Sequence, residues 1–346
     1  MQNLLNPYTM NNTITIDVNS QQPKYQQISD AVIASIESGI FNRGQQLPSI
    51  TELAGSQNIA KVTVARAYED LRQRGIINSQ HGKGFYVANT EVRNKLNIFI
   101  LFDTLNAYKE TLFYALKEEL PADSQLSLFF HHYDKSLFKN LIQNNLGNYN
   151  YYVIMPHFNE DVLDIINQVP KDKLVIIDKA VESLTGKYAA IYQDFENDIY
   201  EALTSGLDLL KKYTRLTLIL SKNHFQFVPS GIIEGFKKFE KAHNIPCAIA
   251  DQYSSELIRE GEAYLIFADN DLISFIKHLI SKDLKPGTDV GLISYDDTPM
   301  KEILEGGITV ISTDFEQMGR TTGRFIRHKI LEKQANPTKL IRRKSL

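Results

Sequence analysis

A group of basic and hydroxyl side chains between residues 61 and 83 has the composition of a phosphate-binding surface. This segment holds five Lys and Arg against two Asp and Glu, whereas the whole chain has a formal net charge of −3. A helix over 61–74 would direct outward Lys61, Thr63, Ala65, Arg66 and Arg72. A small basic surface can contact a phosphate backbone without gripping all nucleic acid, so we expect it to bind DNA.

Three successive helices would position these side chains. Apolar residues recur at helical spacing in residues 25–38 and again in 61–74. Between these segments, Ser49 and Glu52 have the S-x-x-E spacing of a capping box, which predicts the start of a short helix. Gly75 would end the third helix as its C′ glycine. This order predicts a helix-turn-helix whose third helix lies in the major groove.

Two short alternating segments follow the third helix and predict a β-hairpin. Residues 76–79 and 85–87 would be its strands, with Gly82, Lys83 and Gly84 at the tip. Glycines allow a tip to approach a sugar-phosphate backbone closely, and Lys83 adds positive charge. The alternative is a surface hairpin whose glycines only form the turn. Its place directly after a helix-turn-helix favours a wing that contacts DNA.

Composition limits the class of protein. The 346 residues suffice for two or three folding units, and 43% hydrophobic and 23% charged residues are ordinary for a globular protein. The single cysteine, Cys247, excludes an internal disulfide framework and suits a reducing compartment. The sequence has no apolar run of membrane-spanning length and no recognisable secretion signal, so we expect a cytoplasmic location and no membrane contact.

Charge and periodicity change after the hairpin. Residues 1–95 hold nine Lys and Arg against seven Asp and Glu, whereas the remainder holds 29 against 34. The predicted division is a flexible tail (1–12), a winged helix-turn-helix domain (13–88), a linker (89–95) and a larger domain (96–346).

In the larger domain, apolar strand-like runs alternate with helical stretches, which indicates parallel sheets covered on both faces. The runs are 96–102, 126–130, 151–155, 174–177, 216–220, 263–267, 290–293 and 309–311. About 250 residues is large for one such sheet. We therefore expect an α/β fold of two doubly wound parallel-sheet lobes around a cleft.

Motifs spread over the N-terminal domain carry a family resemblance. They are Pro23-x-Tyr25-x-Gln27-Ile28, Gly44-x-x-Leu47-Pro48-Ser49, Thr63-Val64-x-Arg66-Ala67-Tyr68, Gly75-Ile76-Ile77 and Gly82-Lys83-Gly84-x-x-Val87. This pattern resembles the winged helix of GntR-family transcription regulators.

The resemblance implies DNA contacts at the start of the second helix, on the third helix and at the wing tip. The implied residues are Ser49, Lys61, Thr63, Arg66, His81 and Gly82; Arg72 and Lys83 join them on position and charge. Thr51 and Ala60-Lys61 depart from the family, which often has Arg and Ser-Arg there. Because an absent guanidinium changes base readout, the operator sequence cannot be carried over.

Residues 96–346 carry a second set of motifs. They are Leu174-Val175-Ile176-Ile177-Asp178, Gln193-Asp194, Gly235-Phe236, Asn270-Asp271, Gly291-x-x-x-Tyr295-Asp296-Asp297 and Thr313-Asp314-Phe315-x-x-x-Gly319. These resemble the sensor domain of LacI-type repressors, which has a fold like periplasmic binding proteins of type I. The resemblance implies crossovers between lobes near Asp194, Tyr295 and Thr313, and a last strand at 339–343. Related GntR/LacI hybrids imply an effector of the L-arabinose or L-fucose type.

Sugar recognition needs hydrogen-bonding groups for adjacent hydroxyls and an aromatic face against ring C–H groups. The residues that map to such contacts are Tyr108, Asp178, Asn270, Asp296 and Thr313. Phe225 and Phe227 could also line the pocket. Ile232 stands where family members commonly place an Arg, so a bidentate clamp is missing or comes from elsewhere. For any one of these residues, strand-end capping or core packing remains the alternative.

Other groupings of polar residues are not interpreted as sites. His131 and His132 would point to opposite faces at a strand end, so we expect no metal site. Cys247 is expected in the core, and the run 342–344 at a solvated strand edge. The sequence shows no Walker loop, nucleophile elbow or aminotransferase pattern, so we expect no cofactor.

These features predict a homodimeric transcription regulator that binds a double-stranded operator under the control of a small effector, and not an enzyme. In the alternative, residues 96–346 are a sugar-processing enzyme or a transport receptor fused to a regulatory head. A receptor would need an export signal. An enzyme would need a general base, for which Asp178 and Asp296 are candidates that nothing marks as catalytic.

Overall fold

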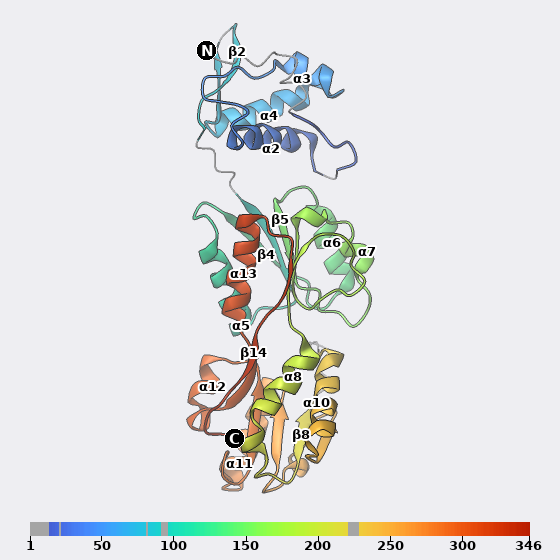
Figure 1. The fold of residues 1–346 in the computed structure, drawn as a ribbon, viewed down its shortest axis with the longest axis vertical. Coiled ribbons are helices and arrows are strands. Elements are labelled where there is room, and N and C mark those ends of the chain that lie inside the picture. The colour runs from blue at the N-terminus through green and yellow to red at the C-terminus, as the bar shows by residue number, and fades with distance from the viewer. Residues whose placement is uncertain (1–13, 21, 81, 91–95, 221–227) are drawn as a thin grey trace. The chain divides into compact units, whose positions relative to one another are not determined.

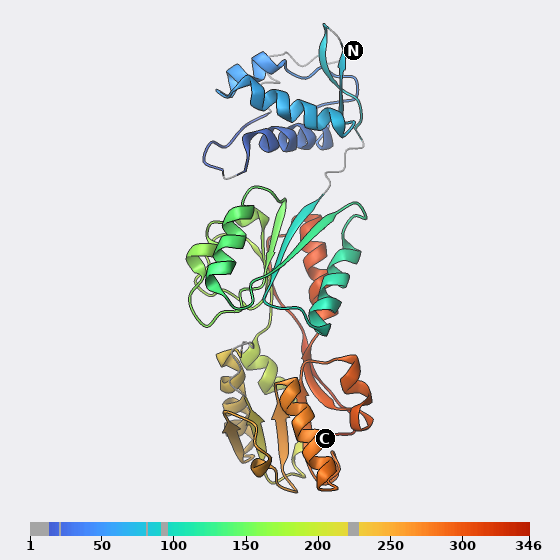
Figure 2. The same cartoon turned by 180° about the vertical axis from the view of Figure 1, so that it is seen from behind.

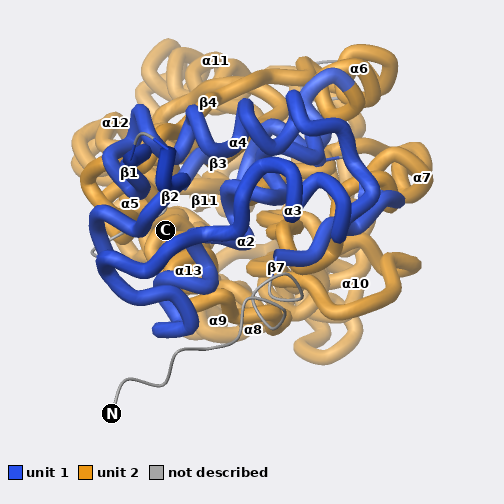
Figure 3. Tube along the Cα trace, turned by 90° about the horizontal axis from the view of Figure 1, so that it is seen from above, with its two compact units in different colours: residues 1–97, 144–150 blue, residues 98–143, 151–346 orange. Residues whose placement is uncertain are grey.

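The computed structural model describes residues 14–20, 22–80, 82–90, 96–220 and 228–346. The chain divides into two compact units, one of residues 1–97 and 144–150 and the other of residues 98–143 and 151–346 (Figure 3). The predicted tail and most of the predicted linker lie outside the described residues, so the domain boundaries stay a prediction.

The first unit contains a helix-turn-helix and a hairpin. Its described elements are α2 (Lys24–Glu37), α3 (Ile50–Ser56), α4 (Lys61–Gln73), β1 (Ile77–Gln80) and β2 (Gly84–Val87). The two strands pair antiparallel, with Ile77 opposite Val87. Gly75 follows α4 with a φ of +70°, a backbone conformation that favours glycine. The predicted helix-turn-helix followed by a wing is therefore confirmed.

The capping box at the start of α3 has both of its hydrogen bonds. The Ser49 hydroxyl accepts from the Glu52 N–H at 3.2 Å, and the Glu52 carboxylate accepts from the Ser49 N–H at 2.8 Å. These bonds satisfy two backbone donors that would otherwise lack partners at the helix start. The cap thereby fixes where α3 begins.

The core of the first unit joins the helices to the wing. Its helical residues include Ile28, Val32, Ile36, Val64, Ala67, Tyr68 and Leu71. Tyr68 is fully buried, and its hydroxyl donates to the Pro48 carbonyl at 2.7 Å. Its ring meets the Phe85 ring of β2 edge-on, with centroids 4.9 Å apart. One face of α4 is therefore committed to packing, which leaves the opposite face available for contacts.

The second unit has two lobes, each built on a six-stranded sheet (Figures 1 and 2). The N-lobe sheet has the order β13-β7-β6-β5-β3-β4. Its strands are β3 (Asn97–Phe102), β4 (Gln125–Phe130), β5 (Tyr151–Ile154), β6 (Leu174–Asp178), β7 (Ala189–Tyr192) and β13 (Lys333–Ala335). β3, β5, β6, β7 and β13 pair in parallel along this sheet.

The C-lobe sheet has the order β14-β12-β11-β10-β8-β9. Its strands are β8 (Leu216–Ile219), β9 (Cys247–Ala250), β10 (Ala263–Ile266), β11 (Gly291–Tyr295), β12 (Thr309–Thr313) and β14 (Thr338–Ile341). All neighbours pair in parallel except β14, which runs antiparallel to β12. Two parallel-sheet lobes confirm the predicted fold class.

Helices cover both faces of each sheet. In the N-lobe they are α5 (Ala107–Glu119), α6 (Lys135–Asn145), α7 (Leu163–Ile166), η1 (Lys171–Lys173) and α13 (Phe315–His328). In the C-lobe they are α8 (Phe195–Ser205), α9 (Leu207–Leu210), α10 (Ser230–His243), η2 (Ser255–Leu257), α11 (Asp269–Ser281), α12 (Pro299–Ile303) and η3 (Leu304–Gly306). Double coverage explains why the strands read as continuous apolar runs.

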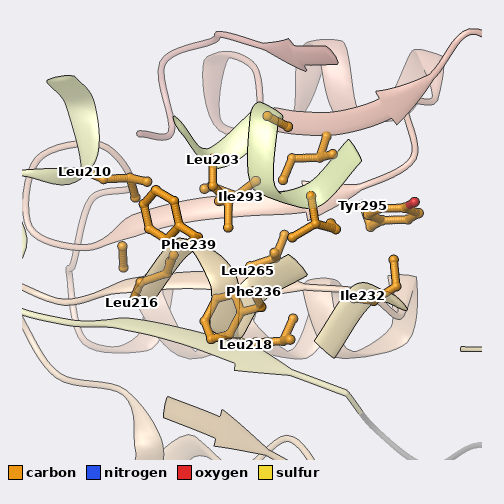
Figure 4. Close-up of a cluster of buried hydrophobic side chains, with 14 of the residues drawn as sticks. Leu203, Leu210, Leu216, Leu218, Ile232, Phe236, Phe239, Leu265, Ile293 and Tyr295 are labelled. Carbon is orange, nitrogen blue, oxygen red and sulfur yellow. The ribbon is translucent and has the colours of Figure 1, made fainter. Parts of the chain in front are cut away.

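Alternate residues of each C-lobe strand enter different cores. Leu216 and Leu218 of β8 pack with Phe236 and Phe239 of α10 (Figure 4). Ile219 of β8 instead joins the core that α11 forms on the other face. This period of two is what a strand buried on both faces requires.

Two glycines let α13 lie directly against α5. A Cβ atom on Gly319 would come within 2.3 Å of the Leu112 carbonyl oxygen. A Cβ atom on Gly323 would come within 2.5 Å of the Glu119 Cβ. Only glycine permits backbones to approach this closely, so α13 is fixed to the N-lobe although β12 before it and β14 after it belong to the C-lobe.

The chain passes between the lobes three times within the described residues. It crosses after β7, at residues 193–194; after β12, at Asp314; and after β13, at 336–337. The crossovers predicted near Asp194 and Thr313 are confirmed. The crossover predicted near Tyr295 is wrong, because Tyr295 ends β11 and both α12 and β12 follow in the same lobe.

The eight predicted runs correspond to β3–β6, β8 and β10–β12, and the predicted last strand corresponds to β14. Three strands were not predicted. β7 (Ala189–Tyr192), β9 and β13 are only three or four residues long. β9 begins at Cys247, which is half-buried against the C-lobe core, so the prediction of a core cysteine holds only in part. The missed strands also lack the run of large apolar residues that marks the predicted ones, because β7 (AAIY) and β9 (CAIA) are rich in alanine and β13 (KQA) is polar.

Candidate functional site

The outward face of α4 presents part of the predicted DNA-contacting set. Lys61 and Arg66 are exposed, and Thr63 is half-buried. The Arg66 guanidinium lies 3.9 Å from the centre of the Tyr25 ring of α2. This contact holds the charge at one place on the helix surface. Arg66 is therefore positioned before any partner binds.

Arg72 and Ser49 have partners inside the first unit. Two nitrogens of the Arg72 guanidinium donate to the Glu69 carboxylate at 2.8 and 2.9 Å. These hydrogen bonds hold the pKa of Glu69 below its ordinary value. The Ser49 hydroxyl is occupied by the α3 cap. Arg66 and Lys61 are therefore better placed for phosphate than Arg72.

The wing tip is exposed at Gly82 and Lys83, and His81 lies outside the described residues. The Lys83 carbonyl accepts from the Gln46 side-chain amide at 2.7 Å and from the Tyr86 hydroxyl at 3.2 Å. The bond from Gln46 ties the tip to the body of the unit, and the bond from Tyr86 ties it to strand β2 of the wing. The Lys83 side chain is thus carried on a supported turn.

A pocket of about 50 Å³ lies between the two lobes of the second unit. It is lined by Asp103, Tyr108, Tyr133, His157, Asp178, Gln193, Phe195, Pro229, Phe267, Tyr295, Asp296 and Phe315. We call this set the interlobe pocket. Its residues come from strand ends of both lobes and from the first two crossovers. Binding between lobes at strand ends is characteristic of α/β folds.

A chain of buried charges forms the N-lobe wall of the pocket. The Lys109 ammonium of α5 pairs with Asp103 Oδ1, and both side chains are 1% exposed. Asp103 Oδ2 accepts from the Tyr133 hydroxyl at 2.9 Å and lies 2.8 Å from His157 Nδ1. The other ring nitrogen, Nε2, lies 3.0 Å from Asp178 Oδ2. His157 therefore bridges two carboxylates.

The protonation of these groups follows from their neighbours. Burial opposes charge on the imidazole ring, but Asp103 and Asp178 outweigh it and raise the pKa of His157 to about 9. Burial also opposes charge on Asp103, but the cations of His157 and Lys109 hold its pKa well below the ordinary value. His157 is thus a cation at neutral pH, and Asp103 is an anion.

His131, next to this chain, is neutral. Burial lowers its pKa to about 4. Its Nε2 lies 3.1 Å from the Met155 carbonyl, and its Nδ1 accepts from the Tyr133 N–H at 3.2 Å. The neighbouring His132 is exposed, so the two rings lie in different environments, as the sequence predicts for a strand end.

Gln193, on the first crossover, joins the N-lobe wall to the C-lobe. Its amide donates to Asp178 Oδ1, and its carbonyl oxygen accepts from the Tyr295 hydroxyl at 3.2 Å. Asp178 has a φ of +69°, which directs the end of β6 into the pocket. A ligand that replaces the hydrogen bond between Tyr295 and Gln193 would alter a contact between the lobes.

Asp296 lies on the C-lobe wall and differs from the N-lobe carboxylates. Its Oδ1 is buried and has no hydrogen-bond partner among the described residues. Burial raises the pKa of Asp296 to about 7, although the Lys301 charge opposes the shift. The Lys301 ammonium instead donates to the carbonyls of Tyr295 and Asp296, at 2.7 and 2.8 Å. It also pairs with Asp269 at 2.9 Å.

Aromatic rings form most of the remaining wall. Phe267 and Tyr295 stack with centroids 4.0 Å apart, and Tyr108 stacks on Phe315 at 4.4 Å. Burial raises the pKa of the Tyr108 hydroxyl well above its ordinary value. Stacked rings beside carboxylates suit a ligand with a C–H face and several donors.

The predicted effector residues fall into three groups. Tyr108, Asp178 and Asp296 line the interlobe pocket. Thr313 lines a neighbouring hollow of about 230 Å³, where its hydroxyl accepts from the Asn336 amide at 2.9 Å. Asn270 is exposed on the first turn of α11 and lines neither hollow.

Phe225 and Phe227 lie outside the described residues. Ile232 is fully buried in the C-lobe core, so an Arg clamp is absent at that position.

Sequence reasoning missed Asp103, Lys109, His157 and several aromatic residues. Asp103 directly follows β3, and His157 follows β5 by three residues. Both positions therefore lie at the carboxyl ends of parallel strands, where α/β folds place their ligands. That rule could have found them. Gln193 and Tyr295 belong to the family motifs, but the resemblance implies no role for them in the pocket.

The C-terminal basic run is only partly solvated, which corrects its interpretation. Arg343 is half-buried and donates to both oxygens of Asp297, at 2.8 and 2.7 Å. These bonds hold the Asp297 carboxylate at Arg343, whereas the carboxylate of its neighbour Asp296 lines the interlobe pocket. Arg342 pairs with Asp208 at 2.9 Å.

Comparison with protein families identifies the first unit. Residues 24–87 match "Bacterial regulatory proteins, gntR family". The probable fructoselysine utilization operon transcriptional repressor of Escherichia coli is 31% identical over 77 residues, which are 22% of this chain and 32% of that protein. The transcriptional repressor YtrA of Bacillus subtilis is 37% identical over 75 residues, 22% of this chain and 58% of that protein. The chain thus spans about a third to somewhat over half of these curated relatives.

Solved structures identify the fold of the second unit. The trehalose repressor of Escherichia coli superposes with a TM-score of 0.59 at 13% identity, over 72% of this chain and 100% of that one. A LacI family regulator from Enterococcus faecium with bound ribose gives 0.57 at 18% identity, over 72% and 98%. The second unit therefore has the LacI-type, periplasmic-binding-protein-like fold. These two structures are named as a repressor and as a transcriptional regulator.

Within the described residues, every helix is too short or too polar to span a membrane.

Proposed function

We propose that this chain is a cytoplasmic transcription regulator whose affinity for operator DNA is controlled by a small effector in the interlobe pocket. The observation that carries the proposal is a GntR-type winged helix followed by a LacI-type fold whose cleft is lined by charged and aromatic residues. Operator DNA is in the cytoplasm, and the relatives of both units are named as regulators.

In this proposal, Lys61, Thr63 and Arg66 of α4 contact the major groove, while Gly82 and Lys83 of the wing contact the backbone. His81 belongs to the same predicted set. Basic side chains on phosphates supply affinity, and contacts to base edges supply specificity. Two copies of the chain would bind a pseudo-palindromic operator, as helix-turn-helix dimers do.

The proposed effector is a polyhydroxylated molecule of monosaccharide size. Asp178, Gln193 and Tyr295 offer hydrogen-bonding groups, and the stacked rings offer an apolar face. The family resemblance makes L-arabinose and L-fucose the first candidates to test. Solved relatives with bound ribose and D-xylulofuranose support a sugar as the class.

The position of the pocket connects binding to regulation. Its lining residues come from both lobes, so a ligand in the pocket would contact both lobes at once. The bond from Tyr295 to Gln193 is one contact that would change. A ligand that favours one arrangement of the lobes shifts the population toward it.

The test is a thermal-shift screen of the full chain against monosaccharides and their phosphates. A ligand that binds only the folded state increases the free energy of unfolding by RT ln(1 + [L]/Kd), which is about 2.7 kcal/mol at a ligand concentration of 100 times Kd. We expect stabilisation by one or two compounds, with Asp178→Asn reducing the shift. Absence of a shift with every compound would contradict the sugar-sensor proposal.

A further inference from the structure

The unpaired carboxylate of Asp296 indicates what kind of group the effector presents to the C-lobe wall. Asp296 Oδ1 is buried without a hydrogen-bond partner among the described residues. A buried carboxylate oxygen without a donor is costly, so native proteins rarely keep one without a ligand or another compensating contact. The complementary group is a donor, and a positively charged donor would compensate the charge as well.

The charges around the pocket leave one carboxylate without a cation. Four carboxylates (Asp103, Asp178, Asp269, Asp296) are accompanied by three cations (Lys109, His157, Lys301) within this cluster. Lys109 and His157 are engaged on the N-lobe wall. Lys301 pairs with Asp269 and donates to two carbonyls, so it holds the Asp296 loop rather than the Asp296 carboxylate.

The lining of the pocket disfavours an anionic ligand. The described lining residues include three Asp and one His but no Lys or Arg. The imidazolium of His157 already lies between two carboxylates. A phosphate or carboxylate on the effector would therefore meet acidic side chains without an available cation among these residues.

The aromatic rings add a second attraction for a cation. Phe267 and Tyr295 form a stacked pair on the C-lobe side of the pocket, and Tyr108 and Phe315 form another on the N-lobe side. The faces of such rings attract ammonium groups, and the attraction increases when the cation is removed from water. A pocket lined by a carboxylate and by aromatic rings is a suitable environment for a protonated amine.

We propose that the effector is a polyhydroxylated amine, such as an amino sugar, whose ammonium group pairs with Asp296 while its hydroxyls bind Asp178 and Gln193. This inference rests on the proposed effector role of the interlobe pocket and narrows its ligand class. In this proposal the two walls have different roles. The N-lobe wall binds the hydroxyl groups of the effector, and the C-lobe wall binds its ammonium group. Lys301 is a positioning residue that fixes the loop carrying Asp296.

The experiment compares amines with their hydroxyl counterparts on the full chain. The probe pairs are D-glucosamine with D-glucose, D-galactosamine with D-galactose, and 2-amino-1,3-propanediol with glycerol; D-glucosamine 6-phosphate, L-arabinose and L-fucose complete the panel. Isothermal titration calorimetry at pH 7.5 measures each affinity. We expect at least one amine to bind about 10- to 100-fold more tightly than its hydroxyl partner, as charge-assisted hydrogen bonds allow.

A matched pair of variants ties the preference to this carboxylate. Asp296→Asn removes the charge and should abolish the preference for the amine. Asp283→Asn is the control, because Asp283 lies in the same lobe with a similar φ, +55° against +57°, but is exposed. This control should retain the preference.

Each outcome is decisive. If neutral sugars bind as well as or better than the amines, the inference is overturned and the proposed sensor function stands. If no probe of either kind binds, both are contradicted. Should Asp296→Asn fail to fold, the wild-type chain gives an independent measure with 2-amino-1,3-propanediol, whose amine stays largely protonated from pH 6 to pH 8. Its affinity should increase over this range, because the raised pKa of Asp296 makes the carboxylate more charged at the higher pH. A pH-independent affinity for this amine would contradict pairing with Asp296.

Discussion

The charged groups of the two units differ in how deeply they are buried. On α4, Lys61 and Arg66 are exposed, and the ring under Arg66 comes from the adjacent helix α2. In the interlobe pocket, Asp103 and His157 are buried, and their mutual contact spans 54 residues. The first arrangement keeps charge available for a partner, whereas the second uses most of its charge internally.

This difference predicts which substitutions affect stability and which affect only binding. An exposed charge contributes little to folding, so its removal should affect mainly binding. A buried charge with a buried partner cannot be removed without leaving the partner uncompensated. The pocket is therefore expected to be sensitive in stability as well as in ligand affinity, and the α4 surface only in DNA affinity.

The largest expected effect is in the N-lobe wall. Lys109→Met leaves Asp103 buried with less positive charge beside it, and should lower the free energy of unfolding by about 3–5 kcal/mol. Urea denaturation followed by circular dichroism measures the change. Lys117→Met, on the exposed side of the same helix, is the control and should change stability by less than about 0.5 kcal/mol. Equal stability of the two variants would show that the buried pair is not needed.

Asp296→Asn should act in the opposite direction and depend on pH. Burial raises the pKa of Asp296 to about 7 from an ordinary 3.8, so the folded state disfavours its charged form. The charges around it come from Lys301, Asp178, Lys109 and Asp269. The wild type therefore loses stability as pH rises from about 4 to about 7. The variant avoids this loss.

At about 1.4 kcal/mol per pKa unit, the variant should be more stable than the wild type by up to about 4 kcal/mol at pH 8. Near pH 4 the variant and the wild type should have equal free energies of unfolding. Denaturation at both pH values, without effector, provides the test. A difference that is the same at pH 4 and pH 8 would refute the assigned pKa.

An intermediate effect is expected on the α4 surface. Arg66→Ala removes an exposed guanidinium from the face predicted to enter the major groove, and should weaken operator binding by about 1–3 kcal/mol. Fluorescence anisotropy at several salt concentrations measures affinity and salt slope. Arg72→Ala should cost less, since Arg72 already pairs with Glu69. Loss of folding in Arg66→Ala, or an unchanged affinity, would remove the contrast between the two units.

The smallest effect concerns Ser49, for which the resemblance implies a DNA contact. In the structure, the Ser49 hydroxyl accepts the hydrogen bond that caps α3. Ser49→Ala should therefore lower the free energy of unfolding by about 1 kcal/mol. Ser56→Ala, at the other end of α3, is the comparison and should cost less. Thermal denaturation distinguishes them. Equal melting temperatures of Ser49→Ala and Ser56→Ala would contradict a stabilising role of the cap.

The two units also differ in how much of their structure could be predicted from the sequence. The winged helix depends on signals a few residues apart, such as the S-x-x-E box and Gly75, and its elements were predicted nearly to the residue. The two-lobed fold was predictable because long apolar runs alternate with helices. Pairing between distant segments was not: Asp103, Lys109, His157 and Gln193 meet only after the N-lobe sheet forms. Asp178 and Asp296 belong to the family motifs and line the pocket, whereas Asn270, mapped from the same motifs, lies outside it; their role in effector binding stays a prediction.

The most direct test of the account measures operator affinity with and without a pocket ligand. A duplex selected from random DNA by the full chain serves as operator, and the strongest stabilising compound of the panel is added at saturation. The account predicts a change in operator affinity of roughly 5- to 150-fold, the usual range for coupled sites, and a smaller change in Asp178→Asn. An operator affinity that is the same with and without the saturating ligand would contradict the claim that the interlobe pocket controls DNA binding.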